Sequence, residues 1–423
     1  MSWLRRRVYP RLAAITALLG LVVIGLWICG RVFTDTYLWS QYIWWIPALW
    51  MIIGAWLLLV VSYGFDLISR RMGGVLMRPI LLLVNIGCTG YLILGVWNMH
   101  RAVLGSPSDP EAIRVMHWNM SGKKIDAAGW TQSVFDRRAD IVLLANPKWG
   151  DERQAILDGL APFAPQDRQR WVNYSYKVHG DPSHFWIQNN AMIASRFPMV
   201  RSGMVRINTA TKPIPGNEQP NPGGGRGWIM FIEFDLSRPT DVYAADGTTD
   251  EEPVAPEEPL IVWFVDLPSD PSIFRQQMMQ DAANAIEAWD GGGWRMGEHV
   301  WKQHTFDGPF PEPDLMVGDF NTPRGSDSIA RLIPSSANMT DAFEQSGFGR
   351  GRSWVPKVNN LIARQPIKLA DWHIDLALIS DGWKTMHYHL DRTQEWGRMD
   401  HAMQTFELIK KTTPNGSSGT ITD

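Results

Sequence analysis

The sequence contains very little cysteine: two residues in 423, Cys29 and Cys88. Both lie in apolar runs, so the chain is not a disulfide scaffold. From residue 106 onward there is no cysteine, which excludes thiolate zinc sites and cysteine nucleophiles there. Acidic residues are scarce in residues 1–105, which hold nine basic residues but only two acids. The remainder holds 31 basic and 41 acidic residues, so two different compositions are joined in one chain.

Three apolar runs, 12–29, 42–64 and 79–97, contain no charged residue. About 20 apolar residues in a helix span a hydrocarbon core of ~30 Å, and only a helix satisfies its own backbone groups in lipid. Residues 1–105 are therefore predicted to form an integral membrane anchor of three transmembrane helices. A cleaved signal peptide is the alternative for the first run, but no small-x-small cleavage site follows it.

The basic residues of the anchor predict its orientation. Four arginines precede the first run and three lie between the second and third, whereas Arg31 alone lies in the first loop. Because cytoplasmic loops are enriched in Lys and Arg, the N-terminus is predicted to be cytoplasmic. Three crossings then place the rest of the chain on the extracytoplasmic side, which suggests the periplasmic or cell-surface face of a bacterial inner membrane.

Residues 106–410 alternate between strand and helix patterns, as in a domain with a substantial sheet. The pattern predicts helices at 126–138 and 271–289, and insertions near 208–226 and 238–258 are rich in Pro, Gly or acidic residues. The tail, 411–423, has the composition of a disordered segment. The predicted strands are Ile113–Asn119, Asp140–Ala145, Asn190–Ala194, Trp228–Phe234, Leu260–Leu267, Leu315–Val317 and Ile374–Ile379.

Polar side chains lie at the ends of these strands, where neighbouring strand ends converge into a site. Carboxylates, amides and one histidine suit a hard, oxygen-ligated cation such as Mg²⁺ or Mn²⁺. The chemistry that such a site supports is attack by an activated water on phosphorus. The residues concerned are Asn119, Asn146, Asp266, Asp319, Asn321, Asp375, Asp400 and His401.

Several ordered motifs in residues 111–408 resemble the endonuclease/exonuclease/phosphatase superfamily. They are Trp118-Asn119, Asn190–Arg196, Val317–Thr322, Gly349–Pro356 with Ile374-Asp375, and Met399-Asp400-His401. The resemblance implies an α+β fold, a four-layer α/β/β/α sandwich of two mixed sheets, here preceded by three transmembrane helices. It also implies a metal-dependent hydrolase of phosphoesters.

The resemblance implies roles for the matching residues. Asn119 would help to hold metal and phosphate, and Asp319 would orient or deprotonate the attacking water. Asn321 would stabilise the charged phosphoryl oxygens, and His401 would be a general acid/base or a phosphate contact. Asp400 would orient His401 and is also a candidate metal ligand, while Asp375 would support the histidine network. Weaker candidates for substrate contact are Asn190, Arg275 and Trp354.

Two positions depart from the family pattern. Asn146 stands where a glutamate is the main metal ligand, and Asp266 stands where many members have a histidine on the phosphate. Either the carboxylate has migrated, so that Asp266 replaces the lost glutamate, or the site has decayed and the domain binds without turnover. The first alternative predicts that Asp266→Ala abolishes metal binding.

The sequence therefore predicts a membrane-anchored, Mg²⁺- or Mn²⁺-dependent phosphodiesterase or phosphomonoesterase with an altered metal site. The alternatives are a catalytically silent binding or assembly domain of the same fold, and an anchored nuclease. A balance of -10 after residue 105 disfavours nucleic acid, because nonspecific affinity for it comes mainly from Lys and Arg. Proximity to the bilayer favours a lipid-derived or small extracytoplasmic phosphoester. The sequence identifies no protein partner.

Overall fold

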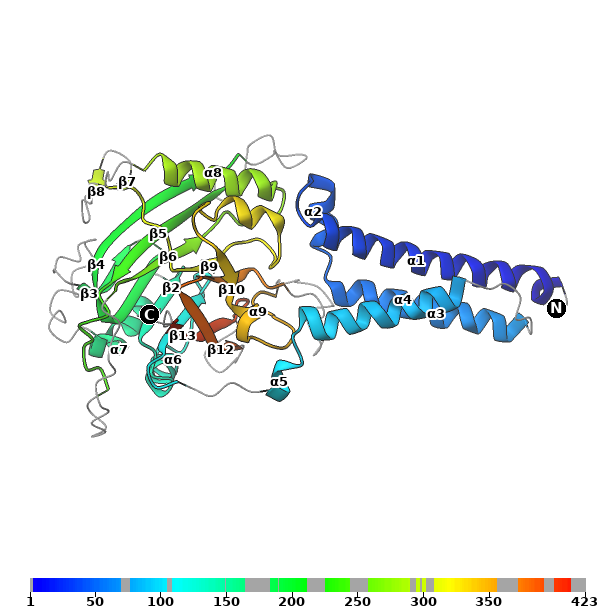
Figure 1. The fold of residues 1–423 in the computed structure, drawn as a ribbon, viewed down its shortest axis with the longest axis horizontal. Helices are drawn as coiled ribbons and strands as arrows, with labels where there is room; N and C mark the ends of the chain where they lie inside the picture. The colour runs from blue at the N-terminus through cyan, green and yellow to red at the C-terminus, as the bar shows by residue number, and fades with distance from the viewer. Residues whose placement is uncertain are drawn as a thin grey trace, which may run out of the picture.

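A computed structural model describes residues 3–69, 77–104, 109–148, 150–163, 183–188, 190–210, 225–243, 258–289, 294–296, 299–301, 308–355, 372–391 and 399–411. Most of the insertions near 208–226 and 238–258, and of the tail from 411, lies outside the described residues. A rod of helices joins a larger domain built around a sheet (Figure 1).

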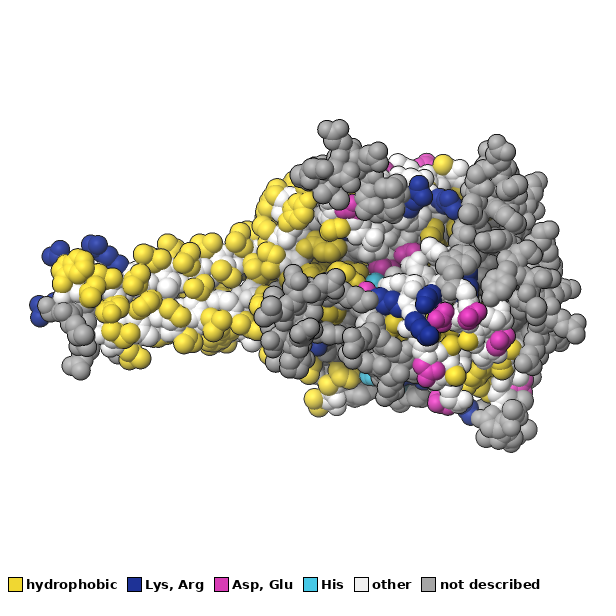
Figure 2. All heavy atoms as spheres, turned by 180° about the vertical axis from the view of Figure 1, so that it is seen from behind, with side chains coloured by type: hydrophobic (Ala, Val, Ile, Leu, Met, Phe, Trp, Pro, Cys, Tyr) yellow, Lys and Arg dark blue, Asp and Glu magenta, His cyan; other side chains and the backbone are white. Residues whose placement is uncertain are grey.

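The rod is a bundle of three long apolar helices. They are α1 (Tyr9–Phe33), α3 (Ala48–Ser69) and α4 (Met77–Tyr91), the last continued by a π-helical turn, Leu92–Val96. All three are long and apolar enough to cross a membrane. Figure 2 shows hydrophobic side chains along the bundle and basic side chains at its far end.

The second helix does not begin where the apolar run begins. A short helix, α2 (Leu38–Trp44), ends before Pro47, and α3 starts at Ala48 instead of at the predicted residue 42. Proline lacks a backbone donor and disfavours a helical conformation in the residue before it, so the run is divided there. In consequence α2 lies at the domain end of the bundle, beside the end of α1 (Figure 1).

The domain contains the strands that the sequence predicts, most of them with similar bounds. The domain also contains three helices, α6 (Ala127–Asp136), α7 (Asp151–Gly159) and α8 (Arg275–Glu287), among the described residues. Two shorter helices are α5 (Arg101–Leu104), which precedes the first strand, and α9 (Ala342–Ser346). The strands are β1 (Ile113–Asn119), β2 (Ile141–Ala145), β3 (Ser183–Gln188), β4 (Ala191–Asn208), β5 (Arg226–Phe234), β6 (Leu260–Asp266), β7 (Trp294–Met296), β8 (His299–Trp301), β9 (Leu315–Asp319), β10 (Met339–Asp341), β11 (Asp375–Ser380), β12 (Trp383–Asp391) and β13 (Met403–Lys410).

The strands form one continuous mixed sheet where two were predicted. Its order is β10-β11-β9-β6-β5-β4-β2-β1-β13-β12, with β3 also paired to β4, and β7 and β8 form a separate hairpin. The long strand β4 joins the two halves: Ala191–Ser195 pairs with β2, and Met199–Asn208 pairs with β5. A register shift between Met199 and Arg201 marks the second pairing. Because one strand serves both halves, no break in hydrogen bonding separates them.

The two halves nevertheless enclose a shared core. Val115 and Leu143 of one half belong to the same buried cluster as Phe264 and Val317 of the other. Alternate side chains of the strands point outward, where α6 and α7 cover one half and α8 covers the other. The sheet is therefore covered by helices outside and packed against itself inside.

The end of the bundle packs on the loops at one edge of the sheet. The Gln41 side chain donates to the carbonyl of Ile273 (2.9 Å), which follows β6. The Trp44 indole donates to Ser326 Oγ (2.8 Å), which follows β9. The indole of Trp372, just before β11, donates to the Trp45 carbonyl (2.7 Å). Bundle and sheet thus meet at the edge where β6 and β9 end and β11 begins.

Candidate active site

The predicted site residues lie where two pairs of parallel strands end. In the pair β1/β2, Asn119 is opposite Ala145, and Asn146 follows directly. In the pair β6/β9, Asp266 is opposite Asp319. The antiparallel strand β11 begins with Asp375 opposite Asp319. The sheet register therefore brings amides and carboxylates from distant parts of the sequence to one edge.

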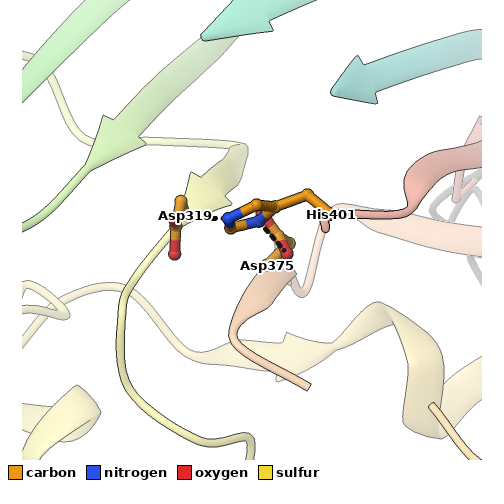
Figure 3. A group of neighbouring side chains, drawn as sticks. All are labelled: Asp319, Asp375 and His401. Atoms are coloured by element: carbon orange, nitrogen blue, oxygen red, sulfur yellow. Dashed lines mark hydrogen bonds and ion pairs between the residues drawn. The ribbon is translucent and has the colours of Figure 1, made fainter. Parts of the chain in front are cut away.

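Three buried side chains form the centre of the site (Figure 3). His401 Nδ1 contacts both oxygens of Asp375, at 3.0 and 2.9 Å. Its Nε2 faces Asp319, 3.9 Å from Oδ2. One potential ligand atom from each of Asp319, Asp375 and His401 lies within 4.8 Å of the others, so the three could hold a metal ion. The imidazole is oriented by one carboxylate and presents its other nitrogen to the second.

Each carboxylate is held in place by hydrogen bonds. Asp319 accepts from the Asn119 side chain (2.8 Å) and from the backbone N–H of Asn321 (2.9 Å). Ser353 Oγ accepts from the backbone N–H groups of Ile374 (2.8 Å) and Asp375 (2.9 Å), and so fixes the start of β11. Their positions are therefore set before any ligand binds.

A chain of side-chain amides links the two strand pairs. Asn146 Nδ2 donates to Asn119 Oδ1 (3.1 Å) and to Asp266 Oδ2 (3.2 Å). Since both neighbours accept, the nitrogen of the Asn146 amide must face them, and its Oδ1 has no hydrogen bond among the described residues. Asp266 and Asn146 thus belong to one hydrogen-bonded network with Asp319, although Asp266 is not a member of the candidate metal group found among the described residues.

The electrostatics of this edge favour a cation. Burial, together with the neighbouring carboxylates of Asp375 and Asp266, raises the pKa of Asp319 to about 8 against the lowering effect of His401. Burial likewise raises the pKa of Asp266 to about 6. Burial lowers the pKa of His401, but Asp375 and Asp319 outweigh it, so the net shift is upward. Crowded buried carboxylates are the arrangement that a divalent cation relieves.

Close packing or backbone conformation restricts which residue types can occupy three positions of the site. A Cβ on Gly318 would lie 1.9 Å from the carbonyl oxygen of Val265 on β6, and φ there is +150°. Asn146 and Asn321, which follow β2 and β9, have φ of +52° and +47°. Asparagine tolerates this left-handed conformation better than most residues with a side chain.

Asp400 does not orient His401, because Asp375 occupies the Nδ1 side of the ring. The Asp400 carboxylate instead forms an ion pair with Lys123. Its backbone carbonyl accepts from Val355 (2.9 Å) and so ties the 349–355 segment to the site. The Asp400 carboxylate is also absent from the candidate metal group found among the described residues.

Two other predicted residues have contacts that the sequence did not reveal. The Asn321 side-chain amide donates to the Leu267 carbonyl (2.8 Å), so part of its donor capacity is used within the protein. The Asn190 side chain is exposed, whereas its carbonyl accepts from the Asn146 backbone N–H (2.5 Å) and so helps to position Asn146.

The predicted substrate contact Arg275 is buried between the domain and the bundle. Its backbone N–H donates to Gln41 Oε1 (2.8 Å), and its guanidinium lies 5.2 Å from the Trp45 ring centroid. Burial lowers its pKa to about 10, against the opposing effect of Asp319. Its side-chain Nε and Nη2 are buried without a hydrogen-bond partner among the described residues, and the contact with substrate stays a prediction. Trp354, by contrast, forms a β-bridge with His401, and their rings lie 6.4 Å apart.

Sequence reasoning missed Lys123 and Ser353. Lys123 lies four residues after Asn119 and lowers the pKa of His401 slightly against the carboxylates. Ser353 lies inside the Gly349–Pro356 motif, but its role depends on β11, which is far away in sequence. The motif itself was the available signal for Ser353, whereas nothing in the sequence pattern marked Lys123.

No family model matches the sequence, and no curated protein matches it. Solved structures do match in fold. The endonuclease/exonuclease/phosphatase from Bacteroides vulgatus is 12% identical, covering 71% of this chain and 99% of its own, with a TM-score of 0.41. The protein of that description from Beutenbergia cavernae is 14% identical, covering 71% and 72%, with a TM-score of 0.41. TDP2 from D. rerio, complexed with a single-strand DNA product, is 12% identical, covering 71% and 100%, with a TM-score of 0.40.

The first two structures are of the superfamily that the sequence motifs resemble. These matches are similarities of fold. At identities of 12 to 14%, the substrate and the reaction have to be argued from this chain's own residues.

Proposed function

We propose that this chain is a membrane-anchored, divalent-metal-dependent hydrolase of a phosphodiester or phosphomonoester. The observation that carries the proposal is the buried group of Asp319, Asp375 and His401, with its linked amides, at the ends of two parallel strand pairs. A structural ion pair would need one carboxylate beside the histidine. Here a second carboxylate with a raised pKa faces the other ring nitrogen.

The donor set fits a hard cation such as Mg²⁺ or Mn²⁺. Carboxylate and amide oxygens are the ligands that these ions prefer. Asp319 and Asp266 would hold it, assisted by the side-chain amides of Asn119 and Asn146, which link these two carboxylates. Asp375 and His401 complete the candidate group but are already bonded to each other. When bound, the ion would neutralise charge on the phosphoryl oxygens.

The remaining residues would carry out the proton transfers. Asp375 holds Nδ1 of His401, so Nε2 is the atom left to donate or accept a proton at the reacting group. Asp319 faces that nitrogen and would orient the attacking water. The second N–H of the Asn321 amide would donate to a phosphoryl oxygen. Trp354, against His401, would line the entrance for the substrate.

The position of the bundle supports a substrate from the bilayer surface. The loops that follow β6 and β9 and precede β11 surround the site, and each of them hydrogen-bonds to the bundle. A phosphoester in or near the lipid headgroups would therefore lie close to the site.

The experiment is an assay of the full chain in detergent with bis-p-nitrophenyl phosphate and p-nitrophenyl phosphate, with and without Mg²⁺ or Mn²⁺. We expect metal-dependent turnover that Asp319→Asn and His401→Gln each reduce by more than about a hundredfold. Matched controls are Asp158→Asn on α7 and His389→Gln on β12, both exposed. Equal rates in site variants and controls would contradict the proposal.

A catalytically silent binding domain is the second candidate. It is favoured by Asn146, which supplies no charge where a glutamate is expected, and by the bond from the Asn321 amide to Leu267. Asn146→Glu separates the two candidates, because it should raise turnover in a weakened enzyme and leave a silent domain inactive. Asp266→Ala should abolish cation binding if this carboxylate has taken over as ligand, and unchanged affinity would contradict that role.

We further propose that the N-terminus is cytoplasmic and the domain extracytoplasmic. The described residues contain three candidate spans, an odd number, and the basic N-terminal segment lies at the end away from the domain. Ser237→Cys in the domain should react with a membrane-impermeant maleimide in intact cells, whereas Arg7→Cys should react only after lysis. The reverse pattern would contradict this orientation.

A further inference from the structure

A cavity lies outside the candidate active site, at the junction between the bundle and the domain. Its volume is about 120 Å³, much more than one water requires. The walls come from α1, α3, the end of α4, and the domain loops around Arg324, Arg350 and His373. It is therefore formed only when bundle and domain are packed together.

The lining of this junction cavity is cationic. It includes Arg31, Arg324 and Arg350, and no Asp or Glu is among the described residues that line it. Arg324 is paired with Asp341, whereas the guanidinium of Arg31 lies 4.5 Å from the Trp44 ring centroid and 5.7 Å from that of Trp27. Among the described residues the Arg31 guanidinium has these two ring contacts and no hydrogen bond or ion pair. The aromatic rings hold this cation without neutralising it.

The position of the cavity along the bundle indicates which groups could neutralise the charge of Arg31. Arg31 lies in the last turn of α1, within a helix apolar enough to span a membrane. Trp27, Trp44 and Trp97 line the same cavity, and tryptophan prefers the membrane–water interface. Phosphate groups of lipids lie at that level, whereas an uncompensated cation there is costly. His373 adds a buried Nε2 with no hydrogen-bond partner among the described residues.

We propose that this junction cavity binds the phosphate of an anionic phospholipid from the leaflet next to the domain. The Arg31 guanidinium would form a bidentate contact with the phosphate, and Arg324 and Arg350 would add positive charge. The acyl chains would lie along the apolar surface of the bundle. The bound lipid would join bundle to domain, and the site does not depend on whether the domain hydrolyses phosphoesters.

The test measures the thermal stability of the full chain in detergent as phosphatidylglycerol, phosphatidylcholine or inorganic phosphate is added. We expect phosphatidylglycerol to raise Tm most and Arg31→Gln to weaken its apparent affinity at least about tenfold. Arg11→Gln, on the exposed surface near the other end of α1, is the matched control and should bind as the unchanged protein does.

Two results would overturn the proposal. One is an equal response to phosphatidylglycerol in Arg31→Gln and in the unchanged protein. The other is a response to inorganic phosphate as large as that to the lipid, which would make the cavity a simple anion site. If Arg31→Gln does not fold, Arg31→Lys with intact-mass measurement of co-purified lipid replaces it. Retention of phosphatidylglycerol equal to that of the unchanged protein would then contradict the bidentate contact.

Discussion

Asn146 and Asn321 both adopt a left-handed backbone conformation at the point where a strand of the site ends. This conformation costs a residue with a larger side chain roughly 1 kcal/mol, and asparagine is one of the few that visit it routinely. The amide at position 146 therefore suits the backbone as well as the network. A glutamate at position 146 would be strained in this conformation. We therefore expect Asn146→Glu to lower the free energy of unfolding slightly.

Ser353 carries a prediction at the same scale. Ser353→Ala removes the acceptor for the buried N–H groups of Ile374 and Asp375. Leaving buried donors unpaired costs ~1–3 kcal/mol, so chemical denaturation should show a loss of that size. Activity should fall as well, because Asp375 orients His401. Ser336→Ala at an exposed position is the control, and an equally small effect for both variants would contradict the role of Ser353.

The raised pKa values of Asp319 and Asp266 predict how stability depends on pH without metal. A carboxyl whose pKa is higher in the folded state binds more protons there, so its contribution is full below the ordinary pKa of 3.8. That contribution is lost as pH rises through about 6 for Asp266 and about 8 for Asp319. The Tm of the chelator-treated protein should therefore fall between these values more steeply than the Tm of Asp319→Asn.

The same groups predict that added Mg²⁺ or Mn²⁺ stabilises the protein more at pH 8 than at pH 5, because ligands must lose their protons to bind. Scanning fluorimetry at both pH values, with and without the cation, measures this. If Tm of the chelator-treated protein fell with pH equally steeply in the unchanged protein and in Asp319→Asn, Asp319 would not titrate as its environment indicates.

Among the elements, the pair β6/β9 is the one that places two carboxylates of the site side by side. Val265 and Gly318 are opposite each other one residue before Asp266 and Asp319. The strands approach so closely that a Cβ on Gly318 would contact the Val265 carbonyl. The glycine of the Val317–Thr322 motif is thus explained by strand packing and not by contact with a ligand.

Gly318→Ala should therefore destabilise the domain by more than about 3 kcal/mol, or prevent folding, because backbone cannot move aside as a flexible side chain does. Gly382→Ala is the matched control, since its Cβ would meet only Ser380 Oγ, at 3.9 Å. Denaturant unfolding of both variants measures the difference. A Gly318→Ala protein as stable as the control would show that the two strands are not held this closely.

At the scale of the whole molecule, the bundle and the domain are joined by buried polar contacts as well as by the chain. Asp35 accepts from the Ser328 backbone N–H (3.0 Å), and the Gln41 side chain bonds to both Ile273 and Arg275. Both bundle residues are buried. The helical bundle therefore also contributes to the position of the loops near the site.

Gln41→Ala should loosen this junction without unfolding the domain. Because a hydrogen bond contributes about 1 kcal/mol, we expect the Arg275 amide to exchange with solvent roughly five- to tenfold faster. Gln132→Ala on α6, whose side chain bonds only to the exposed Asp136, is the control. Unchanged protection of Arg275 in Gln41→Ala would indicate that the other contacts hold the junction by themselves.

The apolar helices, the strand and helix order of the domain and the polar residues at the strand ends could all be predicted from the amino-acid sequence. These features are local: apolar length, periodicity and short motifs such as Val317–Thr322 do not depend on what packs against them. The division of the second apolar run at Pro47 was also a local signal, but the continuous hydropathy concealed it.

Which residues contact one another could not be predicted without the folded structure. It joined the two halves of the sheet through β4, assigned the orienting role to Asp375 instead of Asp400, and enclosed Arg275 between domain and bundle. The physical reason is that pairing register and packing depend on contacts between segments far apart in sequence. Motif spacing identifies candidate residues, whereas burial and neighbouring charge determine their protonation and their partners.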